Sequence, residues 1–478
     1  MPSFEIYIII EQKINILNIQ FEKYNIMKQI RYLIALFLSK AAIKIIKMRG
    51  KSKGTSAPGM LAMKLCPDFI RCAYNSNKDK IISVTGTNGK TTTTGLLAHI
   101  VKESGRQIVH NTEGANMLTG IATALVNNLK FNSKSDFFIF ECDEAYLRKL
   151  YDFLESDYLL VTNLFRDQLD RYGELDTTYK KIKEAISKNK KLKVILNADD
   201  PTLEGIASDN PKVYFGMEQA EFSYAAQSSN APSESTDCHI CKKPLNYSKR
   251  FYAHIGHYMC DCGYKRPNPD YLGFAKIFDS YSELLIKYQN KETKFVINMP
   301  GLYNVYNALG AISAALELGV SEDIIKHALE TYSSVFGRAE STVINGKKTL
   351  IQLIKNPVGA SEVIRQIQGF EKSKLVIILN DDYADGRDVS WIWDADFEVL
   401  SSYHQNIVVS GTRANDAALR LKYAGVDEKL ITVEKDIKRA VDLAIENAQS
   451  DDTLLILPTY TALLKMQTIF AAKNKVIS

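Results

Sequence analysis

The chain has 478 residues, of which 46% are apolar and 24% are charged. This length fits two to four domains, and the composition excludes a disordered chain, a collagen, a coiled coil and a multi-span membrane protein. The net charge of +5 is concentrated at the start, because residues 1–60 hold ten Lys/Arg and three Asp/Glu. The rest of the chain is slightly acidic, so we expect no nucleic-acid partner.

Residues 1–53 are predicted to be an N-terminal extension that carries a basic amphipathic helix at 27–47. Two sets of residues mark its faces, Lys40, Lys44 and Lys47 on one and Leu33, Leu36, Phe37 and Ile43 on another. Its apolar run is too short to span a bilayer, and no signal-peptide cleavage site is evident. Two interpretations stay open: a solvated helix packed on the next domain, or peripheral contact with anionic lipid headgroups.

From residue 80 onward, short apolar runs alternate with helical stretches, which predicts an α/β fold with a mostly parallel sheet covered on both faces. A central domain is predicted over residues 54–336 and, after a boundary near Gly337, a Rossmann-like α/β domain over 337–478. The predicted strands are 80–85, 137–142, 158–162, 192–196, 375–379, 407–410 and 454–457, and the predicted helices include 92–103 and 304–318.

The first predicted strand runs into the sequence GTNGKTT, after which a helix begins. Its glycines let backbone amides converge on an anion, and the helix N-terminus adds partial positive charge. Lys90 is predicted to neutralise β- and γ-phosphate oxygens, and the Thr91 hydroxyl to bind Mg²⁺. Val84 occupies the position of the first glycine of the full pattern, but the strand and helix around the loop favour nucleotide binding over a structural turn. The predicted nucleotide-binding residues are Gly86, Thr87, Asn88, Gly89, Lys90, Thr91 and Thr92.

Three acidic residues follow the strand predicted at 137–142. Glu141, Asp143 and Glu144 lie at the carboxyl end of that strand, where ligands bind in open parallel sheets. Mg²⁺ favours one or two carboxylates with phosphate oxygens and water, so Glu141 is the predicted protein ligand. The alternative is that all three are surface acids at a strand end.

An insertion over residues 222–274 carries four of the seven cysteines. Cys238 and Cys241 form one pair, Cys260 and Cys262 a second, and four thiolates on two short loops suit a tetrahedral structural zinc ion. Three histidines in or between the pairs, His239, His254 and His257, are weighed as substitute ligands, but the four cysteines are preferred. The other three cysteines, Cys66, Cys72 and Cys142, are expected to be reduced thiols of a cytoplasmic protein.

Seven motifs follow one another along the chain: Gly86–Thr92 (GTNGKTT), Asn111–Gly120 (NTEGANMLTG), Glu141–Ala145 (ECDEA), Asn163–Gly173 (NLFRDQLDRYG), Asn197–Pro201 (NADDP), Gly301–Ala315 (GLYNVYNALGAISAA) and Gly337–Glu340 (GRAE). Together and in this order, they resemble the Mur ligase family, the ATP-dependent amide-forming enzymes of peptidoglycan assembly. The resemblance implies Lys90 and Thr91 on the phosphates and Mg²⁺, Glu141 as a Mg²⁺ ligand, Asn307 near the adenine and Arg338 near the phosphates.

Three departures from the usual family pattern narrow this resemblance. Only some 80 residues precede the phosphate loop, too few for the family's uridine-nucleotide-binding domain. The string Asp167–Asp170 has Gln168 where the family usually has a metal-binding His, which puts a second metal ion in doubt. The family's Asp-Tyr-Ala-His string is replaced by Lys355–Gly359 (KNPVG), followed by Asn380–Glu398. Together these features resemble the MurT family, the ligase-like subunits of lipid II isoglutaminyl synthases, which also carry a zinc ribbon.

That resemblance implies a heterodimer with a GatD-like glutaminase subunit that supplies ammonia, and lipid II as the substrate at the inner face of the membrane. The pair would amidate the α-carboxylate of D-glutamate through an acyl phosphate, with Lys90, Arg338 and Glu141 serving phosphoryl transfer. Asp388 would complete the partner's Cys/His triad. The alternative is that Asp388 is a helix cap or a turn carboxylate. Trp391 and Trp393 are expected to be packing or interface anchors. Two other functions stay open: a ligase adding an amino acid, like folylpolyglutamate synthase, or a non-enzymatic ATP- and zinc-binding scaffold.

Overall fold

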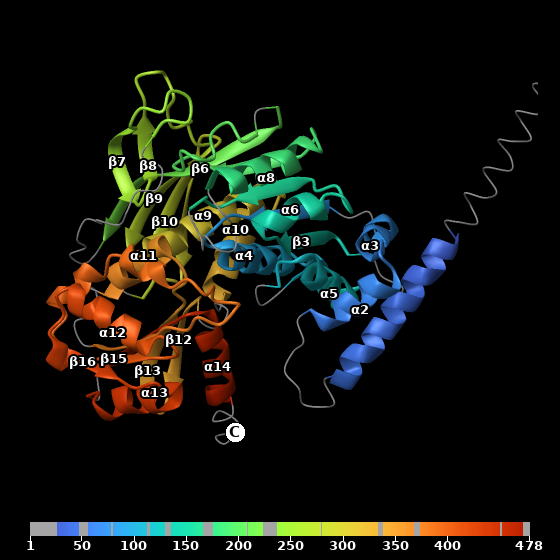
Figure 1. Cartoon of the computed structure of the whole chain (residues 1–478). Helices are drawn as coiled ribbons and strands as arrows, with labels where there is room; N and C mark the ends of the chain where they lie inside the picture. Colours follow the sequence, from blue (N-terminus) through green and yellow to red (C-terminus); the bar gives the residue numbers. More distant parts are fainter. Residues whose placement is uncertain are drawn as a thin grey trace, which may run out of the picture. The chain divides into compact units, whose positions relative to one another are not determined.

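The structure is a computed structural model, and it describes residues 26–46, 56–77, 80–111, 115–129, 135–165, 175–207, 209–222, 237–278, 280–332, 338–367, 373–449 and 452–471. The chain divides into two compact units, Met1–Ser83 with Arg106–Asp157, and Val84–Gly105 with Tyr158–Ser478. Figure 1 labels the helices and strands of both units.

The first unit begins with a helix at residues 26–46, and packs α2 (Ala57–Leu65) against α5 (Leu118–Asn128). Gly59 permits this close approach, since a Cβ there would lie 1.9 Å from Thr119 O; its amide donates to Thr123 Oγ1 at 2.9 Å. The parallel strands β2 (Ile108–His110) and β3 (Phe137–Glu141) form its sheet, and every residue of β3 is buried. The remaining helices are α3 (Phe69–Asn77) and α6 (Glu144–Leu150).

Strand β1 (Lys80–Thr85) begins in the first unit and ends in the second. The strand order in the first unit is β1-β3-β2. The strand order in the second unit is β11-β10-β9-β6-β5-β4-β1. β4 (Tyr158–Val161), β5 (Lys193–Asn197), β6 (Lys212–Phe222) and β9 (Tyr271–Ile277) run parallel, with Tyr158 opposite Lys193. β10 (Ser282–Tyr288) and β11 (Lys291–Ile297) add an antiparallel edge. Helix α9 (Leu302–Glu317) packs on β5, β6, β9 and β10 and on α4 (Lys90–Glu103), which also contacts α10 (Glu322–Thr331).

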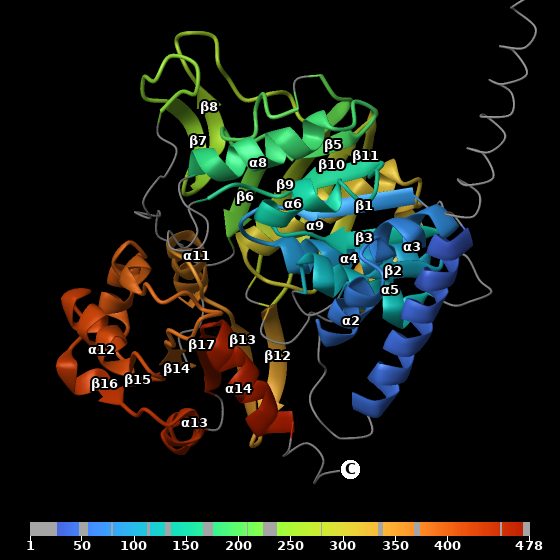
Figure 2. The ribbon, with the colours of Figure 1, turned by 45° about the vertical axis from the view of Figure 1, so that its right-hand side comes forward.

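A six-stranded sheet forms the C-terminal part of the second unit, in the order β12-β13-β17-β14-β15-β16 (Figure 2). Only β12 is antiparallel to its neighbour. Successive residues of β14 enter opposite cores, Leu375 and Ile377 on one face, Val376 and Ile378 on the other. Such two-sided burial is what a parallel strand covered by helices on both faces requires. The strands are β12 (Arg338–Ile344), β13 (Lys347–Gln352), β14 (Ser373–Ile378), β15 (Ile407–Ser410), β16 (Ile431–Val433) and β17 (Thr453–Pro458); the helices are α11 (Pro357–Ile367), α12 (Ala414–Tyr423), α13 (Ile437–Glu446) and α14 (Tyr460–Ala471).

The predicted α/β class is confirmed, and the predicted strands and helices are present with ends shifted by a few residues. Sequence reasoning missed the strands β6, β9, β10 and β11, which extend the central sheet. All seven cysteines are free thiols in the structure. Within the described residues, no helix is both long enough and apolar enough to cross a bilayer.

The N-terminal helix is present over residues 26–46, but its packed face differs from the predicted one. Tyr32, Ala35, Leu36 and Ser39 are buried, whereas Leu33 and Phe37 are exposed by 43% and 62%. The predicted grouping of Leu33, Leu36, Phe37 and Ile43 on one face is therefore wrong, because neighbouring helices cover only the Leu36 side. Lys47 and residues 47–53 lie outside the described residues.

Candidate active site

The loop between β1 and α4 has a shape that only glycine allows at two positions. Gly86 has a φ of 128°, and Gly89, the N-cap of α4, has a φ of 82°. A Cβ on Gly86 would lie 2.3 Å from Thr162 Oγ1, and one on Gly89 would lie 1.9 Å from Asn307 Oδ1. Backbone angle and space both exclude a side chain. No side chain of Gly86 or Gly89 covers the backbone at the start of α4, and backbone amides at a helix N-terminus suit an anion.

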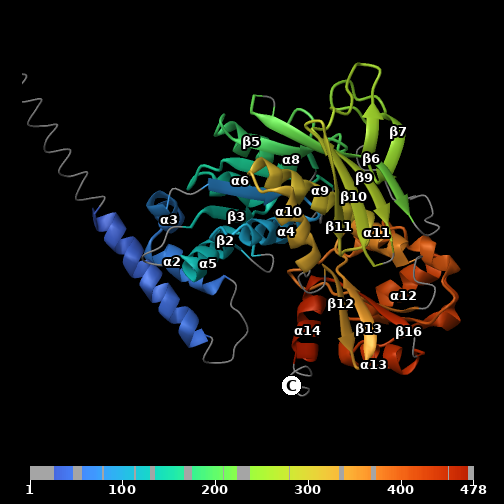
Figure 3. The ribbon, with the colours of Figure 1, turned by 180° about the vertical axis from the view of Figure 1, so that it is seen from behind.

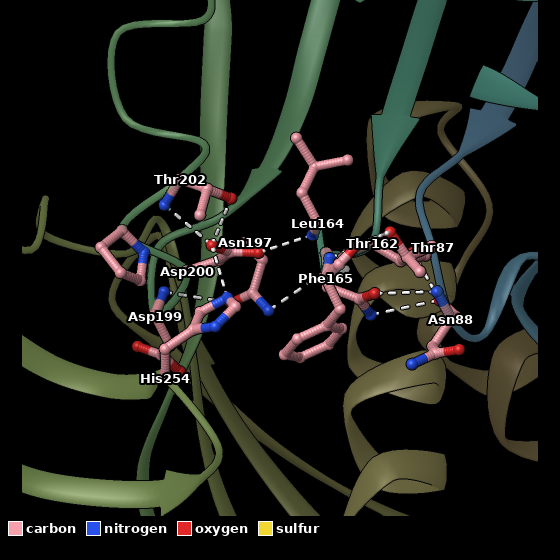
Figure 4. Close-up of polar contacts among 12 residues, drawn as sticks. Thr87, Asn88, Thr162, Leu164, Phe165, Asn197, Asp199, Asp200, Thr202 and His254 are labelled. Atoms are coloured by element: carbon pink, nitrogen blue, oxygen red, sulfur yellow. Dashed lines mark hydrogen bonds and ion pairs between the residues drawn. The ribbon is translucent and has the colours of Figure 1, made fainter. Parts of the chain in front are cut away.

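Polar groups of the segment that follows β4 hold this phosphate loop in place (Figure 4). Thr87 Oγ1 donates to Phe165 O and accepts from Phe165 N, both at 3.0 Å. Asn163 Oδ1 accepts from Asn88 N at 2.9 Å, and Asn163 Nδ2 donates to Asn88 O at 3.1 Å. Thr162 Oγ1 donates to the same carbonyl at 2.7 Å. The loop is thus ordered by protein contacts, which lowers the entropic cost of binding a phosphate.

Lys90 directs its ammonium group into the same loop. Its Nζ donates to Gly86 O and, at 3.4 Å, to Thr87 O, and the residue is only 8% exposed. Thr91 and Thr92 are each 6% exposed. A positive charge and the N-terminus of a 14-residue helix therefore lie together, which is the arrangement that the phosphate-loop pattern predicts.

The two remaining predicted nucleotide-site residues are located differently. Asn307 lies in α9, is 5% exposed and abuts Gly89, and its contact with adenine stays a prediction. Arg338 is the first residue of β12, where it pairs with Gln352, but its side chain lies outside the described residues. The string Asp167–Asp170, which bears on a second metal ion, also lies outside them.

The acidic residues after β3 belong to the first unit and are buried. Glu141, Asp143 and Glu144 are 2%, 3% and 5% exposed, so the alternative of surface acids is wrong. Asn116 Nδ2 donates to Glu141 Oε1 at 3.3 Å, and the Glu141 backbone exchanges two hydrogen bonds with the Asn111 carboxamide. Asp143 has a structural task, because its Oδ1 accepts from Ala145 N and caps α6. Glu141 as the metal ligand stays a prediction.

Two residues that sequence reasoning left without a role reach the phosphate loop from the C-terminal part of the second unit. Lys355 Nζ donates to Thr87 O at 3.2 Å, and Asn356 Nδ2 donates to Asn88 Oδ1 at 2.9 Å. Asn356 is itself held by Gly359 N, 2.9 Å from its Oδ1. The sequence marks this string only as a departure from the family pattern. Its partners lie 268 positions earlier, so no local signal could have revealed the contact.

Asp388 lies on the surface of the C-terminal part of the chain. Its Oδ1 accepts from Ser390 N at 2.8 Å. Hydrogen bonds from the Ser390 side chain and from this backbone amide hold the pKa of the Asp388 carboxyl below its usual value. Trp391 is 8% exposed within the core, whereas Trp393 is 48% exposed beside Tyr423, with ring centroids 5.6 Å apart. Trp391 is therefore a packing residue, and Trp393 presents an aromatic surface to solvent.

The four cysteines of the insertion come together, with their Sγ atoms all within 4.8 Å of one another. Cys238 Sγ lies 3.5 Å from Cys262 Sγ, and Cys241 Sγ lies 3.4 Å from Cys260 Sγ. Tetrahedral zinc with Zn–S bonds of about 2.3 Å requires S–S separations of about 3.8 Å, so the donor set fits that ion. Burial alone would raise the pKa of Cys238, but the backbone amides of Cys241 and Ile240 and the neighbouring thiols lower it to about 7. Cys238 thus favours a thiolate. Backbone hydrogen bonds would lower the pKa of Cys260 and Cys262, but burial and the other thiols of the cluster raise it.

Among the described residues, the group of possible metal ligands contains the four cysteines and none of the three histidines of the insertion. His254 stands between β7 (Asn246–Tyr252) and β8 (Ile255–Met259), is fully buried, and places Nε2 3.3 Å from Asp200 Oδ1. Its ring centroid lies 4.6 Å from that of Phe165, and Asp200 Oδ2 accepts from Leu164 N at 2.8 Å (Figure 4). Because Phe165 also bonds Thr87, the tip of this hairpin supports the segment that holds the phosphate loop.

Comparisons with known proteins agree with this geometry. The Mur ligase middle domain model matches residues 84–315, and the MurT ligase C-terminal model matches residues 353–463. A pseudomurein peptide ligase type C from Methanothermus fervidus has a TM-score of 0.65 at 23% identity, covering 83% of this chain and 79% of its own. The fold is thus that of the Mur-type ligases.

The relatives define the family more narrowly. The lipid II isoglutaminyl synthase (glutamine-hydrolyzing) subunit MurT of Staphylococcus aureus strain COL is 38% identical, covering 90% of this chain and 96% of its own. The same subunit of Streptococcus pneumoniae is 36% identical over 88% and 93% of the two chains. The chain belongs to the MurT family of Mur ligases.

Proposed function

We propose that this chain is the synthetase subunit that converts the D-glutamate α-carboxylate of lipid II into D-isoglutamine, using ATP and ammonia from a GatD-like glutaminase partner. The observation that carries this proposal is that relatives named as synthase subunits align over nine-tenths of the chain, while Lys90 and its phosphate loop are intact. The amino-acid-adding and scaffold alternatives are not favoured, because the C-terminal match is to the MurT model.

The chemistry begins with activation of a carboxylate, which is otherwise a poor electrophile. A carboxylate oxygen attacks the γ-phosphorus of ATP, the bond to the β,γ-bridging oxygen breaks, and ADP leaves. Ammonia then attacks the acyl carbon and loses a proton, and phosphate leaves. The phosphate keeps the oxygen that came from the carboxylate. Lys90, Arg338 and the amides at the start of α4 would stabilise charge on the transferring phosphoryl group. Magnesium, held by Thr91 and Glu141, would neutralise phosphate charge when bound.

The nucleotide contacts follow from the loop. Gly86, Thr87, Asn88, Gly89 and Thr92 would surround the phosphates with Lys90 and Thr91, and Asn307 would approach the adenine. Strand β1, which enters the loop, is the sheet neighbour of β3, which ends at Glu141. In open α/β sheets, ligands bind at the carboxyl ends of the strands. Because ATP is a cytoplasmic metabolite and lipid II is membrane-bound, we place the reaction at the inner face of the cell membrane.

Lys355 is proposed as a further cation at the transferring phosphoryl group, in addition to Lys90 and Arg338. Replacing Lys355 with methionine should lower kcat by about a hundredfold with little change in ATP affinity, because the ammonium acts mainly on charge that develops during transfer. Steady-state amidation kinetics and ATP titration calorimetry measure the two quantities. The exposed Lys348 in β13 offers the matched control, Lys348→Met, which should retain full activity. A Lys355→Met enzyme with unchanged kcat would remove this residue from the mechanism.

We propose that the four cysteines bind one structural zinc ion and that the ribbon stabilises the phosphate loop through His254. Cys238→Ser should reduce the zinc content from about one ion per chain to nearly none. It should also weaken ATP binding by about tenfold, which is about 1.4 kcal/mol, because His254 would lose its anchorage beside Phe165. Elemental analysis and calorimetry measure these changes. Cys72→Ser, a buried cysteine of the first unit, is the control. Unchanged ATP affinity in zinc-free protein would show that ribbon and loop are independent.

An amidation assay on lipid II tests the function itself. The chain, Mg-ATP, lipid II and glutamine with the glutaminase subunit are expected to convert the D-glutamate carboxylate to the amide, seen as a mass change localised by fragmentation. Ammonium at high concentration should replace both glutamine and the partner. If neither nitrogen source yields the amide while ATP is bound, the acceptor is a different carboxylate.

A further inference from the structure

The solvent side of the N-terminal helix, residues 26–46, is apolar over its whole length. We call its exposed large side chains the apolar stripe: Ile26, Met27, Ile30, Leu33, Ile34, Phe37, Leu38 and Ile45. Each is between 43% and 68% exposed. At about 100° per residue, the eight positions fall within a band of about 140° around the helix. Contiguous exposed apolar surface of this kind marks a binding face on a globular protein.

The opposite side of the helix is already used for packing. Tyr32 is 4% exposed, and its ring centroid lies 5.3 Å from that of Phe69 in α3. Lys28 Nζ pairs with Asp68 Oδ2 at 2.7 Å, and Arg31 Nε donates to Leu65 O at the end of α2. The helix therefore has two apolar sides, one packed on the first unit and one facing outward. Figure 3 shows this long helix beside α2 and α3.

The charges around the stripe identify its binding surface. Residues 26–46 contain four Lys/Arg and no Asp/Glu, and two of the four, Lys28 and Arg31, contact the first unit. On the same helical projection, Lys40 lies just outside one border of the stripe, next to Leu33, and Lys44 lies just inside it, between Leu33 and Phe37. A helix that combines an apolar band with a basic border lies in the headgroup region of a bilayer and prefers anionic lipids. A protein groove would instead need an acidic partner shaped to the whole helix.

We infer that the apolar stripe inserts into the surface of an anionic lipid bilayer and holds the chain beside the membrane. Membrane binding itself is argued from the helix alone, and only its benefit rests on the proposed function. An enzyme that acts on a lipid-linked substrate gains from a high local concentration of that substrate. The helix lies parallel to the bilayer plane in this arrangement, with Phe37 and Ile34 toward the acyl chains and the lysines toward phosphate groups.

Flotation of the full chain with lipid vesicles tests the inference. The wild-type chain should bind vesicles that contain phosphatidylglycerol more tightly than vesicles of phosphatidylcholine alone, and salt should weaken the binding. The double variant Ile34→Glu/Phe37→Glu should lose at least about tenfold in vesicle affinity. Leu419→Glu/Leu464→Glu changes two similarly exposed leucines of the C-terminal helices and should bind as the wild type does.

Vesicle binding is measured without ATP or turnover, so it can fail or succeed independently of the proposed amidation. The variant side chains are exposed, and circular dichroism should show unchanged helix content. Equal vesicle affinity of the Ile34→Glu/Phe37→Glu variant and the wild type would overturn the inference, as would absent binding to anionic vesicles. A concentration-dependent dimer that the same double variant abolishes would overturn it in favour of contact between two copies of the chain.

Discussion

Replacing Lys90 with methionine should reduce amidation by at least about a thousandfold with either glutamine or ammonium as the nitrogen source. Lys90 is the cation that the fold places at the start of α4 with its ammonium against Gly86 O and Thr87 O. Methionine keeps the length of the side chain and removes the charge, so the loss falls on phosphoryl transfer. Amide formation measured by mass spectrometry under saturating ATP gives the size of the effect.

Lys102 in the last turn of the same helix provides the control for this experiment. Lys102→Met removes the same charge from an exposed position of α4 and should leave the rate within about twofold. Both variants should unfold cooperatively near the wild-type temperature, because neither substitution opens a cavity in the core. A Lys90→Met chain with wild-type amidation would contradict the assignment of the phosphate loop and would favour the scaffold alternative.

Asp388→Asn should abolish glutamine-dependent amidation, by about ten-thousandfold, while ammonium-dependent amidation by the same complex continues. Asp388 is exposed and holds a lowered pKa through the hydrogen bonds from Ser390, so an ionised carboxylate is available to a partner's histidine. The asparagine conserves the shape and removes the negative charge that orients an imidazole. Paired assays with glutamine and with ammonium separate the two half-reactions.

The matched control for Asp388 is Asp323→Asn in α10, whose side chain is 95% exposed and distant in sequence. It should retain both activities. Equal loss of the glutamine-dependent and ammonium-dependent rates in Asp388→Asn would place this carboxylate in the synthetase site rather than in the partner's triad. Retention of both rates would show that Asp388 is only a turn carboxylate, a role that its hydrogen bond with Ser390 already gives it.

The sequence predicts the phosphate loop because its signal is local. The run from β1 into α4 contains the glycines, the lysine and the helix start within seven residues, and the observed φ angles at Gly86 and Gly89 are the physical reason for those glycines. The four cysteines are predictable for the same reason, since zinc coordination demands their type and spacing. In both motifs, the spacing of residues close together in the sequence determines most of the local geometry.

The rest of the site depends on contacts between distant segments, which one sequence does not reveal. Lys355 and Asn356 reach the loop from 268 positions away, and His254 reaches Phe165 from the tip of an inserted hairpin. The N-terminal helix shows a similar limit. Its periodicity predicts an amphipathic helix, but Leu33 and Leu36 are both leucine, and only tertiary packing decides that Leu36 is buried while Leu33 remains exposed.

Transfer of a labelled oxygen tests most directly whether this chain activates a carboxylate with ATP. Lipid II labelled with ¹⁸O in the D-glutamate α-carboxylate is incubated with the chain, Mg-ATP and ammonium, and the released phosphate is analysed by mass spectrometry. An acyl phosphate requires one ¹⁸O in each phosphate released for each amide formed, and Lys90→Met should release almost none. Amide formed with unlabelled phosphate would contradict the account, because the carboxylate oxygen would then have left by another route.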